Sequence, residues 1–173
     1  NSESTQKFFT QKINLMIMEK DSKEEHVDLL KVIRIDVLTA TPNMQNSEIE
    51  QLDFFSEIPL LNFELEDGSN FLMSSIPRHI AIEIAKILSN IREVDSRLTI
   101  ADLVSEICII NKVVIDAIVP YSNAYQASVE IKLEGVEGLL HFQMIPSHSV
   151  LLGLLNNAPI YIAKSLLSTQ EEE

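Results

Sequence analysis

The segment IPSHSVLLGLLNNAPIYI, residues 145–162, constrains the fold more than any other part of the chain. Ser147 stands where a helix N-cap belongs, and the almost wholly apolar run 150–155 follows it. Asn156 and Asn157 end this run, because Asn tolerates the left-handed conformation that helix ends often need. A helix that is apolar on every side must be covered on every side. We therefore expect a buried helix in the middle of the fold, followed directly by a short buried strand.

Alternating apolar and polar residues predict strands through much of the chain. The run LLKVIRIDVL, residues 29–38, is the clearest of them and indicates a strand with one face in water. The Asp67-Gly68 pair predicts a hairpin turn between two neighbouring strands. The predicted strands cover residues 8–18, 29–38, 58–66, 70–75, 112–119, 124–133, 139–145 and 158–162.

Two further helices are predicted where apolar residues recur at helical spacing. Pro77 suits the first turn of one helix, and the other begins near Thr99. Their apolar stripes are Ile80, Ile84, Ile87, Leu88 and Ile91 in the first helix, and Ile100, Leu103, Val104, Ile107 and Ile110 in the second. The order of strands, two helices, three strands, helix and strand predicts an α+β fold: a mixed, largely antiparallel sheet packed with about three main helices.

One compact domain with a sizeable core is expected, because 46% of the 173 residues are hydrophobic. Residues 1–28 are expected to form an N-terminal strand and link, 29–166 the main domain with an insertion at 41–56, and 167–173 an acidic tail. No apolar run reaches the roughly 18 residues of a membrane-spanning helix, so no contact with a membrane is expected. Cys108 has no second Cys to pair with and is expected to be a buried structural thiol, which fits a reducing cytoplasm.

The chain carries a net charge of −13, and the charge is unevenly distributed. No Lys or Arg lies between Arg34 and Arg78, whereas the same span holds eight acidic residues. A protein that binds duplex nucleic acid usually shows a basic patch, and the sequence shows none. A nuclease of this charge would need metal ions to bridge it to phosphate. The alternative is a solvated acidic surface that aids solubility.

The segment 145–162 resembles the signature of the bifunctional nuclease domain family. That signature runs roughly R-P-S-D-A-I-x-L-A and then, after a short gap, A-P-I-[FY]-V. The family Arg falls on Ile145 and the family Asp on His148. The residues that match at the same spacing are Pro146, Ser147, Leu152, Ala158, Pro159, Ile160 and Tyr161.

The resemblance extends over about residues 29–166. Arg97, Asp102 and Leu103 match the family's R-P-x-T-H-D-L, whose His falls on Ala101. The resemblance implies a mixed α+β domain, often dimeric, with nuclease activity on DNA and RNA. Most polar residues of the family motifs are replaced in this chain, so the resemblance predicts the architecture better than the chemistry.

Asp102 and Arg97 are the first candidate catalytic residues. The Asp102 carboxylate can hold a divalent metal such as Mg²⁺ or Mn²⁺, or act as a base. Thr99 and Asp102 also have the spacing of a capping box, in which the carboxylate satisfies a backbone donor at the helix start. Arg97 can bind a phosphate through two parallel hydrogen bonds, or it can pair with Asp95 or Asp102.

His148 and Ser147 form the second candidate pair. His148 is expected in the first turn of the buried helix, where the positive end of the helix dipole disfavours the imidazolium ion. A neutral His there can act as a general base or metal ligand, or it can simply bond a neighbour. Ser147 is the candidate substrate-binding hydroxyl. His141 and Gln143 share one face of a strand, but spacing does not say whether His141 meets His148.

Glu64 and Glu66 also share one strand face, and together they can bind Mg²⁺ as in metal-dependent nucleases. In the alternative, Phe63 and Leu65 face the core while both Glu side chains face water. No H-x-x-x-H, H-x-H or C-x-x-C spacing occurs, so the sequence gives no signal for a transition-metal site.

Two functions therefore stand side by side. The first is a metal-dependent nuclease, a phosphodiesterase acting on DNA or RNA. The second is a non-catalytic oligomeric domain that binds a partner or acts as a scaffold, supported by the replaced motif residues and the acidic charge. A homodimer is expected in either case, because the apolar strand predicted at Phe8–Met18 would need covering if it lay at a sheet edge.

Overall fold

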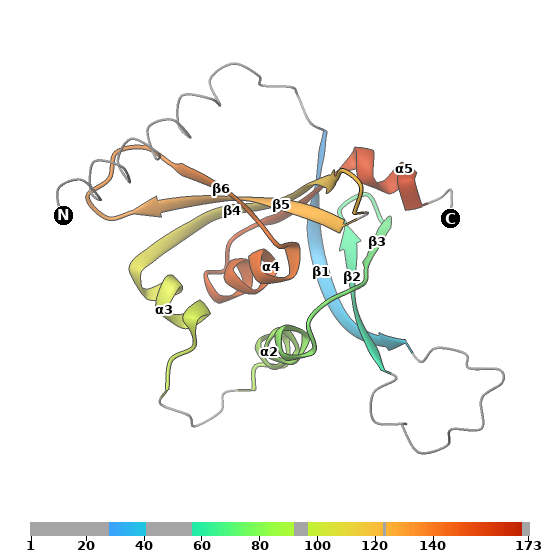
Figure 1. Ribbon diagram of the computed structural model, residues 1–173, viewed down its shortest axis with the longest axis horizontal. Helices are drawn as coiled ribbons and strands as arrows, with labels where there is room; N and C mark the ends of the chain where they lie inside the picture. The colour runs from blue at the N-terminus through green and yellow to red at the C-terminus, as the bar shows by residue number, and fades with distance from the viewer. Residues whose placement is uncertain (1–27, 41–56, 92–96, 123, 171–173) are drawn as a thin grey trace.

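The computed structural model describes residues 28–40, 57–91, 97–122 and 124–170. These residues form an α+β fold in which one seven-stranded sheet carries its main helices on one face (Figure 1). The predicted fold class is confirmed. The predicted strand at 8–18, the predicted insertion at 41–56 and residues 171–173 of the predicted tail lie outside the described residues.

The sheet has the strand order β3-β2-β1-β7-β4-β5-β6. Its neighbouring strands are antiparallel except β7 and β4, which run parallel, so the sheet is mixed. Each strand predicted within the described residues is present, and β4 begins four residues earlier than predicted. The strands are β1 (Leu29–Ala40), β2 (Ile58–Leu65), β3 (Asn70–Met73), β4 (Cys108–Val119), β5 (Ala124–Leu133), β6 (Leu140–Met144) and β7 (Ile160–Ala163).

The three main helices of the described chain are α2 (Arg78–Leu88), α3 (Ile100–Ile107) and α4 (Pro146–Leu155), and the short η2 (Lys164–Leu166) and α5 (Leu167–Gln170) follow β7. As predicted, α4 is central, with seven of its ten residues buried against α2, α3, β4 and β5. Asn157 has a φ of 51°, the left-handed conformation expected after this helix. Among the described residues, no helix combines the length and the apolar character needed to cross a membrane.

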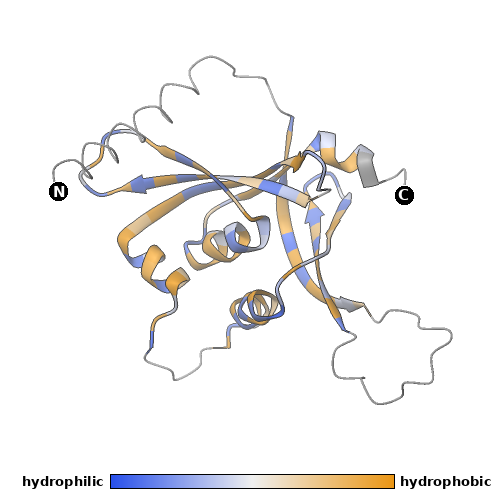
Figure 2. Cartoon of the chain, viewed as in Figure 1, coloured by the Kyte–Doolittle hydropathy of each residue, from blue (hydrophilic) through white to orange (hydrophobic). Residues whose placement is uncertain are grey.

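The core lies between the helices and the inner face of the sheet. Alternation along each strand places apolar residues on that face, and Figure 2 shows the resulting concentration of apolar residues along α4 and β4. The outer face is more polar, as the alternation in residues 29–38 predicts. The side chains that are completely buried include Leu61, Phe63, Leu65, Phe71, Ile84, Val113, Ile115, Val129, Val150 and Ile162.

The start of α4 corrects one sequence prediction. The N-cap is Ile145, with no side-chain cap, and Pro146 is the first helical residue. Proline suits this position because its fixed φ is helical and its missing N–H is not needed there. Ser147 therefore lies inside the first turn and not at the cap, and it is only 3% exposed.

The second correction concerns the end of α3. The helix stops at Ile107, and Ile110, which was predicted to continue its apolar stripe, belongs to β4 together with Cys108. The residues Cys108–Ile110 pair with Leu133–Ile131 of β5, so the sheet ladder overrides the helical pattern. Cys108 is nevertheless buried, as predicted, and burial raises the pKa of its thiol. None of the residues of α3 is buried.

Candidate functional site

The first candidate residues meet at the start of α3. Asp102 Oδ2 accepts hydrogen bonds from the Thr99 backbone N–H at 2.8 Å and the Thr99 hydroxyl at 2.7 Å. The Asp102 N–H in turn donates to Thr99 Oγ1 at 3.2 Å. These contacts form the capping box, which was one of the two roles predicted for Asp102. The other predicted role was that of a metal ligand or general base.

Asp102 and Arg97 also line one hollow. A cavity of about 690 Å³ lies where the end of α2, the start of α3 and the end of α4 meet. Lys86 and Glu83 of α2 line it as well, and they form an ion pair with Nζ and Oε1 3.0 Å apart. The structure therefore brings the candidates Arg97 and Asp102 to one hollow, beside a second cation and a second carboxylate.

Ser147 and His148 lie elsewhere. Both belong to the first turn of α4, whereas the hollow contacts the opposite end of that helix through Leu154, Leu155 and its flanking Asn157. Ser147 offers almost no surface to a ligand because it is 3% exposed. His148 Nδ1 is buried and has no hydrogen-bond partner in the described part of the chain. The four predicted site residues thus form two separate pairs and not one site.

His141 is on the outer face of the sheet, away from α4 and His148. It stands opposite Glu130 in the β5–β6 ladder, with His141 Nδ1 4.0 Å from Glu130 Oε1. Glu130 also accepts from Lys112 Nζ at 2.8 Å and from Asn111 Nδ2 at 2.9 Å. Burial alone would raise the pKa of Glu130, but these hydrogen bonds and the charge of Lys112 lower it. The cluster is a compact ion-pair network with its charges already matched.

Glu64 and Glu66 lie as in the second of their two predicted arrangements, in which Phe63 and Leu65 face the core. Phe63 and Leu65 are completely buried, and the Glu side chains have other contacts. Glu64 Oε2 lies 3.4 Å from Arg34 Nη1, while Glu66 Oε1 accepts the Lys31 backbone N–H at 3.1 Å. Across the described ranges, no three His, Cys, Asp or Glu side chains are grouped so that they could hold a metal ion.

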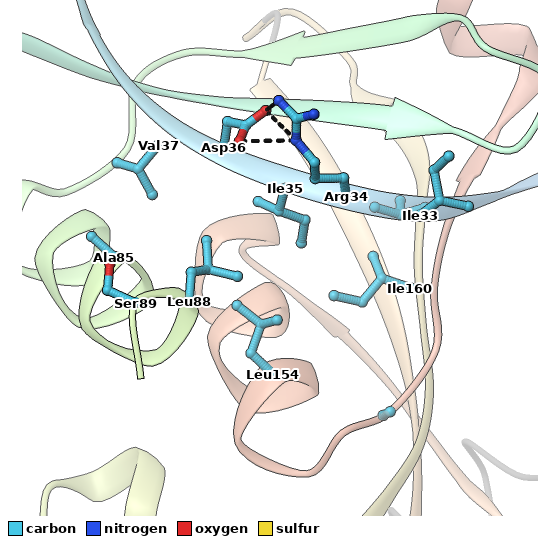
Figure 3. Close-up of a pocket in the computed structure, with 12 residues that line it drawn as sticks. Ile33, Arg34, Ile35, Asp36, Val37, Ala85, Leu88, Ser89, Leu154 and Ile160 are labelled. Atoms are coloured by element: carbon cyan, nitrogen blue, oxygen red, sulfur yellow. Dashed lines mark hydrogen bonds and ion pairs between the residues drawn. The ribbon is translucent and has the colours of Figure 1, made fainter. Parts of the chain in front are cut away.

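A second hollow was not predicted from the sequence. It has a volume of about 620 Å³ and lies between β1, the end of α2, the end of α4 and the start of β7 (Figure 3). Its walls include Ile33, Leu88, Leu154 and Ile160, and the backbone of β1 forms one side. The adjacent apolar residues Val32 and Ile33, which interrupt the alternation of the strand, were the available signal.

Comparison with known proteins adds no relative to this description. The chain matches no family model, and no curated protein is similar to it in sequence. The function is therefore inferred from the geometry of the two hollows and of the surface around them.

Proposed function

We propose that the protein is a non-catalytic, self-associating binding domain, and that two copies meet through one face of α3. Ile100, Leu103 and Ile107 form this α3 face, because residues three and four apart share one side of a helix. Their side chains are 82%, 51% and 61% exposed. This observation carries the proposal: the capped helix packs on the core of its own described chain through the half-buried Ala101 and Val104, while these three larger apolar side chains face outward.

Physical reasons favour a partner on this face. A helix of only eight residues is marginal in water and depends on packing against an apolar surface. Fully burying one Leu or Ile side chain contributes about 1.5–3 kcal/mol. A two-fold axis would use the α3 face twice and bury six such side chains, which is why a second copy is the proposed occupant. The bifunctional nuclease family, which the sequence resembles, is often dimeric, and this supports a second copy as the partner.

The test is the oligomeric state in solution. The double variant Leu103→Gln/Ile107→Gln removes apolar surface without adding charge, so we expect it to be monomeric in sedimentation experiments at concentrations where the wild type is dimeric. Glu106→Gln is the matched control on the same exposed helix and should leave the dimer intact. A wild type that stays monomeric at high concentration would overturn the proposal.

Salt provides an independent measurement of the same contact. Each copy carries a net charge of −13, so two copies repel one another at low ionic strength. Added salt weakens this repulsion, because charges farther apart than the Debye length, roughly 8–10 Å near physiological ionic strength, are largely screened from one another. Burial of apolar side chains is largely unaffected. We therefore expect the dimer to tighten as sodium chloride is raised. Weakening by salt would instead indicate an interface held by opposite charges.

The nuclease remains the second candidate function, and one observation favours it. Arg97, Lys86 and Asp102 line one hollow, where cations could contact phosphate and a carboxylate could hold Mg²⁺ or Mn²⁺. The decisive comparison is between Asp102→Ala and Thr99→Ala, because both break the capping box but only the first removes the carboxylate. Metal-dependent cleavage of DNA or RNA that is lost in Asp102→Ala and kept in Thr99→Ala would establish this function. Protein that is inert with both metals would exclude it.

We also propose a cytoplasmic location, on the basis of cysteine usage. The Cys108 thiol is buried and donates to the Val104 carbonyl oxygen at 3.0 Å. The sequence has no second Cys for an internal disulfide, as is usual for proteins of reducing compartments. Fractionation of cells that express the protein would test this location.

A further inference from the structure

The sheet opens into a fork between β1 and β7. These strands pair only through Leu29–Lys31 of β1 and Tyr161–Ala163 of β7. A β-bulge between Val32 and Arg34 then turns β1 away, and from Arg34 to Ala40 it pairs with β2 alone. Bulges commonly bend a strand in this way where pairing ends. One edge of β1 therefore faces the second hollow, which we call the fork.

The hydrogen-bond pattern shows which groups of β1 face the fork. Leu65 N–H donates to Ser69 O, and Leu65 O accepts from Gly68, so Leu65 directs its backbone groups toward β3. By alternation, the even-numbered residues of β2 bond to β1, and their partners Arg34, Asp36 and Leu38 are used. Ile35 and Val37 then direct their N–H and C=O groups into the fork, and Thr39 directs its own toward the same side of β1, beyond the residues that line the fork.

Pro59 supports this assignment. It lies in β2 opposite Thr39, where its missing N–H removes no bond to β1, because odd-numbered β2 residues face the other way. No residue of the described chain pairs with Ile35, Val37 or Thr39 on the fork side. Among the residues that the structure describes, the N–H and C=O groups of these three alternate residues thus form an open strand edge.

The fork walls suit the side chains of an added strand. Figure 3 shows Ile35, Leu88, Leu154 and Ile160 directed into the space beside β1, whereas Arg34 and Asp36 project away from it. An extended segment lying along β1 would alternate in the same way. Its inward side chains would contact the apolar floor, and its outward side chains would lie beside the polar outer face of the sheet.

We propose that β1 binds an extended basic peptide of another protein in the fork by strand addition. Strand addition at an exposed edge combines main-chain hydrogen bonds with pockets for alternate side chains. The outer face beside the fork favours a basic peptide. Arg34 Nη2 lies 2.7 Å from Asp36 and Nη1 lies 3.4 Å from Glu64, so these three side chains carry one negative charge in excess. Lys or Arg on the outward side of the peptide would match it.

The occupant is a single segment because the fork is closed on both sides. β1 borders it on one side, and Ala158 and Ile160 border it on the other, with α2 and α4 beneath. The edge of a second folded copy would bring its own neighbouring strands into these walls. The fork site also shares no residue with the α3 face, so it goes beyond the proposed self-association and can stand or fall separately.

Binding can be measured with an alternating valine–lysine peptide, with a valine–glutamate peptide as the charge control. Leu88→Lys should weaken binding of the lysine peptide about tenfold or more, since it puts a cation into the apolar floor, a cost of about 1.4 kcal/mol or greater. The matched control is Ile82→Lys on the same helix, because Ile82 is 46% exposed, close to the 41% of Leu88, and lies outside the fork. Equal loss in both variants, or preference for the glutamate peptide, would overturn the proposal.

Peptides methylated on alternate backbone nitrogens separate strand addition from mere apolar adsorption. Methylation in one register removes the donors that face β1, and in the other register it removes donors on the far edge. One methylated peptide should lose binding while the other keeps it, and the Leu103→Gln/Ile107→Gln variant should bind the unmethylated peptide as the wild type does. Equal affinity for both methylated peptides would overturn strand addition.

Hydrogen exchange tests the open edge itself. The N–H groups of Ile35 and Val37 should exchange fast in the protein alone, and those of Asp36 and Leu38 slowly, because only the latter face β2. Adding the lysine peptide should slow Ile35 and Val37 selectively. If these two amides are already slow in the protein without peptide, the edge is covered by this chain or by a second copy, and the proposal is wrong.

Discussion

Thr99 and Asp102 hold the start of α3 through reciprocal hydrogen bonds. The Thr99 hydroxyl oxygen accepts the Asp102 N–H at 3.2 Å, and Asp102 Oδ2 accepts the Thr99 N–H at 2.8 Å. Both backbone donors would otherwise lack a partner within the helix. Because α3 packs on the core only through half-buried side chains such as Ala101, we expect this cap to contribute to the order of its first turn.

Removing the cap should loosen α3 locally. We expect Asp102→Ala to cost about 1 kcal/mol of helix stability, the usual loss for an N-terminal cap. Because α3 is peripheral, the effect should appear as roughly fivefold faster hydrogen exchange of its amides, with a smaller change in global unfolding. Thr99→Ser keeps a capping hydroxyl and is the control. Unchanged exchange in Asp102→Ala would show that the capping box contributes nothing to the helix.

Asn156 links three elements, and its loss should destabilise the whole domain. Its Nδ2 donates to Ser105 Oγ of α3 and to the Leu152 carbonyl of α4, each at 3.0 Å, and its Oδ1 accepts the Ile110 N–H of β4 at 3.4 Å. We expect Asn156→Ala to lower the free energy of unfolding by about 2 kcal/mol, since a typical net hydrogen bond contributes about 1 kcal/mol and the two bonds at 3.0 Å are the stronger ones.

Urea unfolding measures this loss. Ser105→Ala removes only one of the three contacts of Asn156, so its midpoint should fall between those of wild type and Asn156→Ala. Equal midpoints for Asn156→Ala and wild type would mean that solvent replaces these contacts without cost.

The fold was predictable because local pattern and burial agree along most of the chain. Asn156 and Asn157 end α4 as expected, and the apolar run before them occupies the centre. The prediction failed where two signals overlapped. Cys108 and Ile110 continue the helical spacing of α3 but also suit a strand, and pairing with β5 decides in favour of β4. Single-sequence periodicity cannot include that partner strand.

The candidate site was less predictable than the fold. The capping box of Asp102 and its position beside Arg97 follow from spacing and chain order. The separation of His148 from that pair does not, because it depends on which end of α4 faces α3. The fork likewise arises from a bulge, a long-range event in which a strand changes partners. In the sequence, only the adjacent apolar residues Val32 and Ile33 indicate a bulge at this point of the strand.

Glu130 should make stability depend on acid. Its folded-state pKa is lowered: burial acts against this, but hydrogen bonds from Lys112 and Asn111 and the Lys112 charge outweigh it. A lowered pKa means that the folded protein binds the proton less readily than the unfolded chain. The contribution is complete above the ordinary Glu pKa of about 4.3 and is lost as pH falls through the lowered value.

The measurement is the free energy of unfolding between neutral and strongly acidic pH. We expect Glu130→Gln to be less stable than wild type near neutral pH and to approach it at the acid end. In a Lys112→Met background, Glu130→Gln should lower the free energy of unfolding by less than it does in the wild type. The reason is that Lys112→Met has already removed the principal cation beside Glu130. A difference independent of pH would indicate that packing of the Glu130 side chain, and not its charge, matters.

Gly153 sets how closely α4 approaches the sheet. A Cβ at this position would lie 3.1 Å from Val113 Cγ2 and 3.3 Å from Ile160 Cγ1. These neighbours are 0% and 5% exposed, so they have little room to move aside.

Gly153→Ala gains about 1 kcal/mol from helix propensity, but overpacking a core typically costs about 1–3 kcal/mol. We therefore expect a net loss of about 1 kcal/mol in urea unfolding. In a Val113→Ala background the shorter contact is removed and the contact with Ile160 remains, so the same substitution should cost less than it does in the wild type. A Gly153→Ala protein more stable than wild type would show that α4 can shift outward without cost, and that backbone entropy, not the 3.1 Å contact with Val113, decides the residue here.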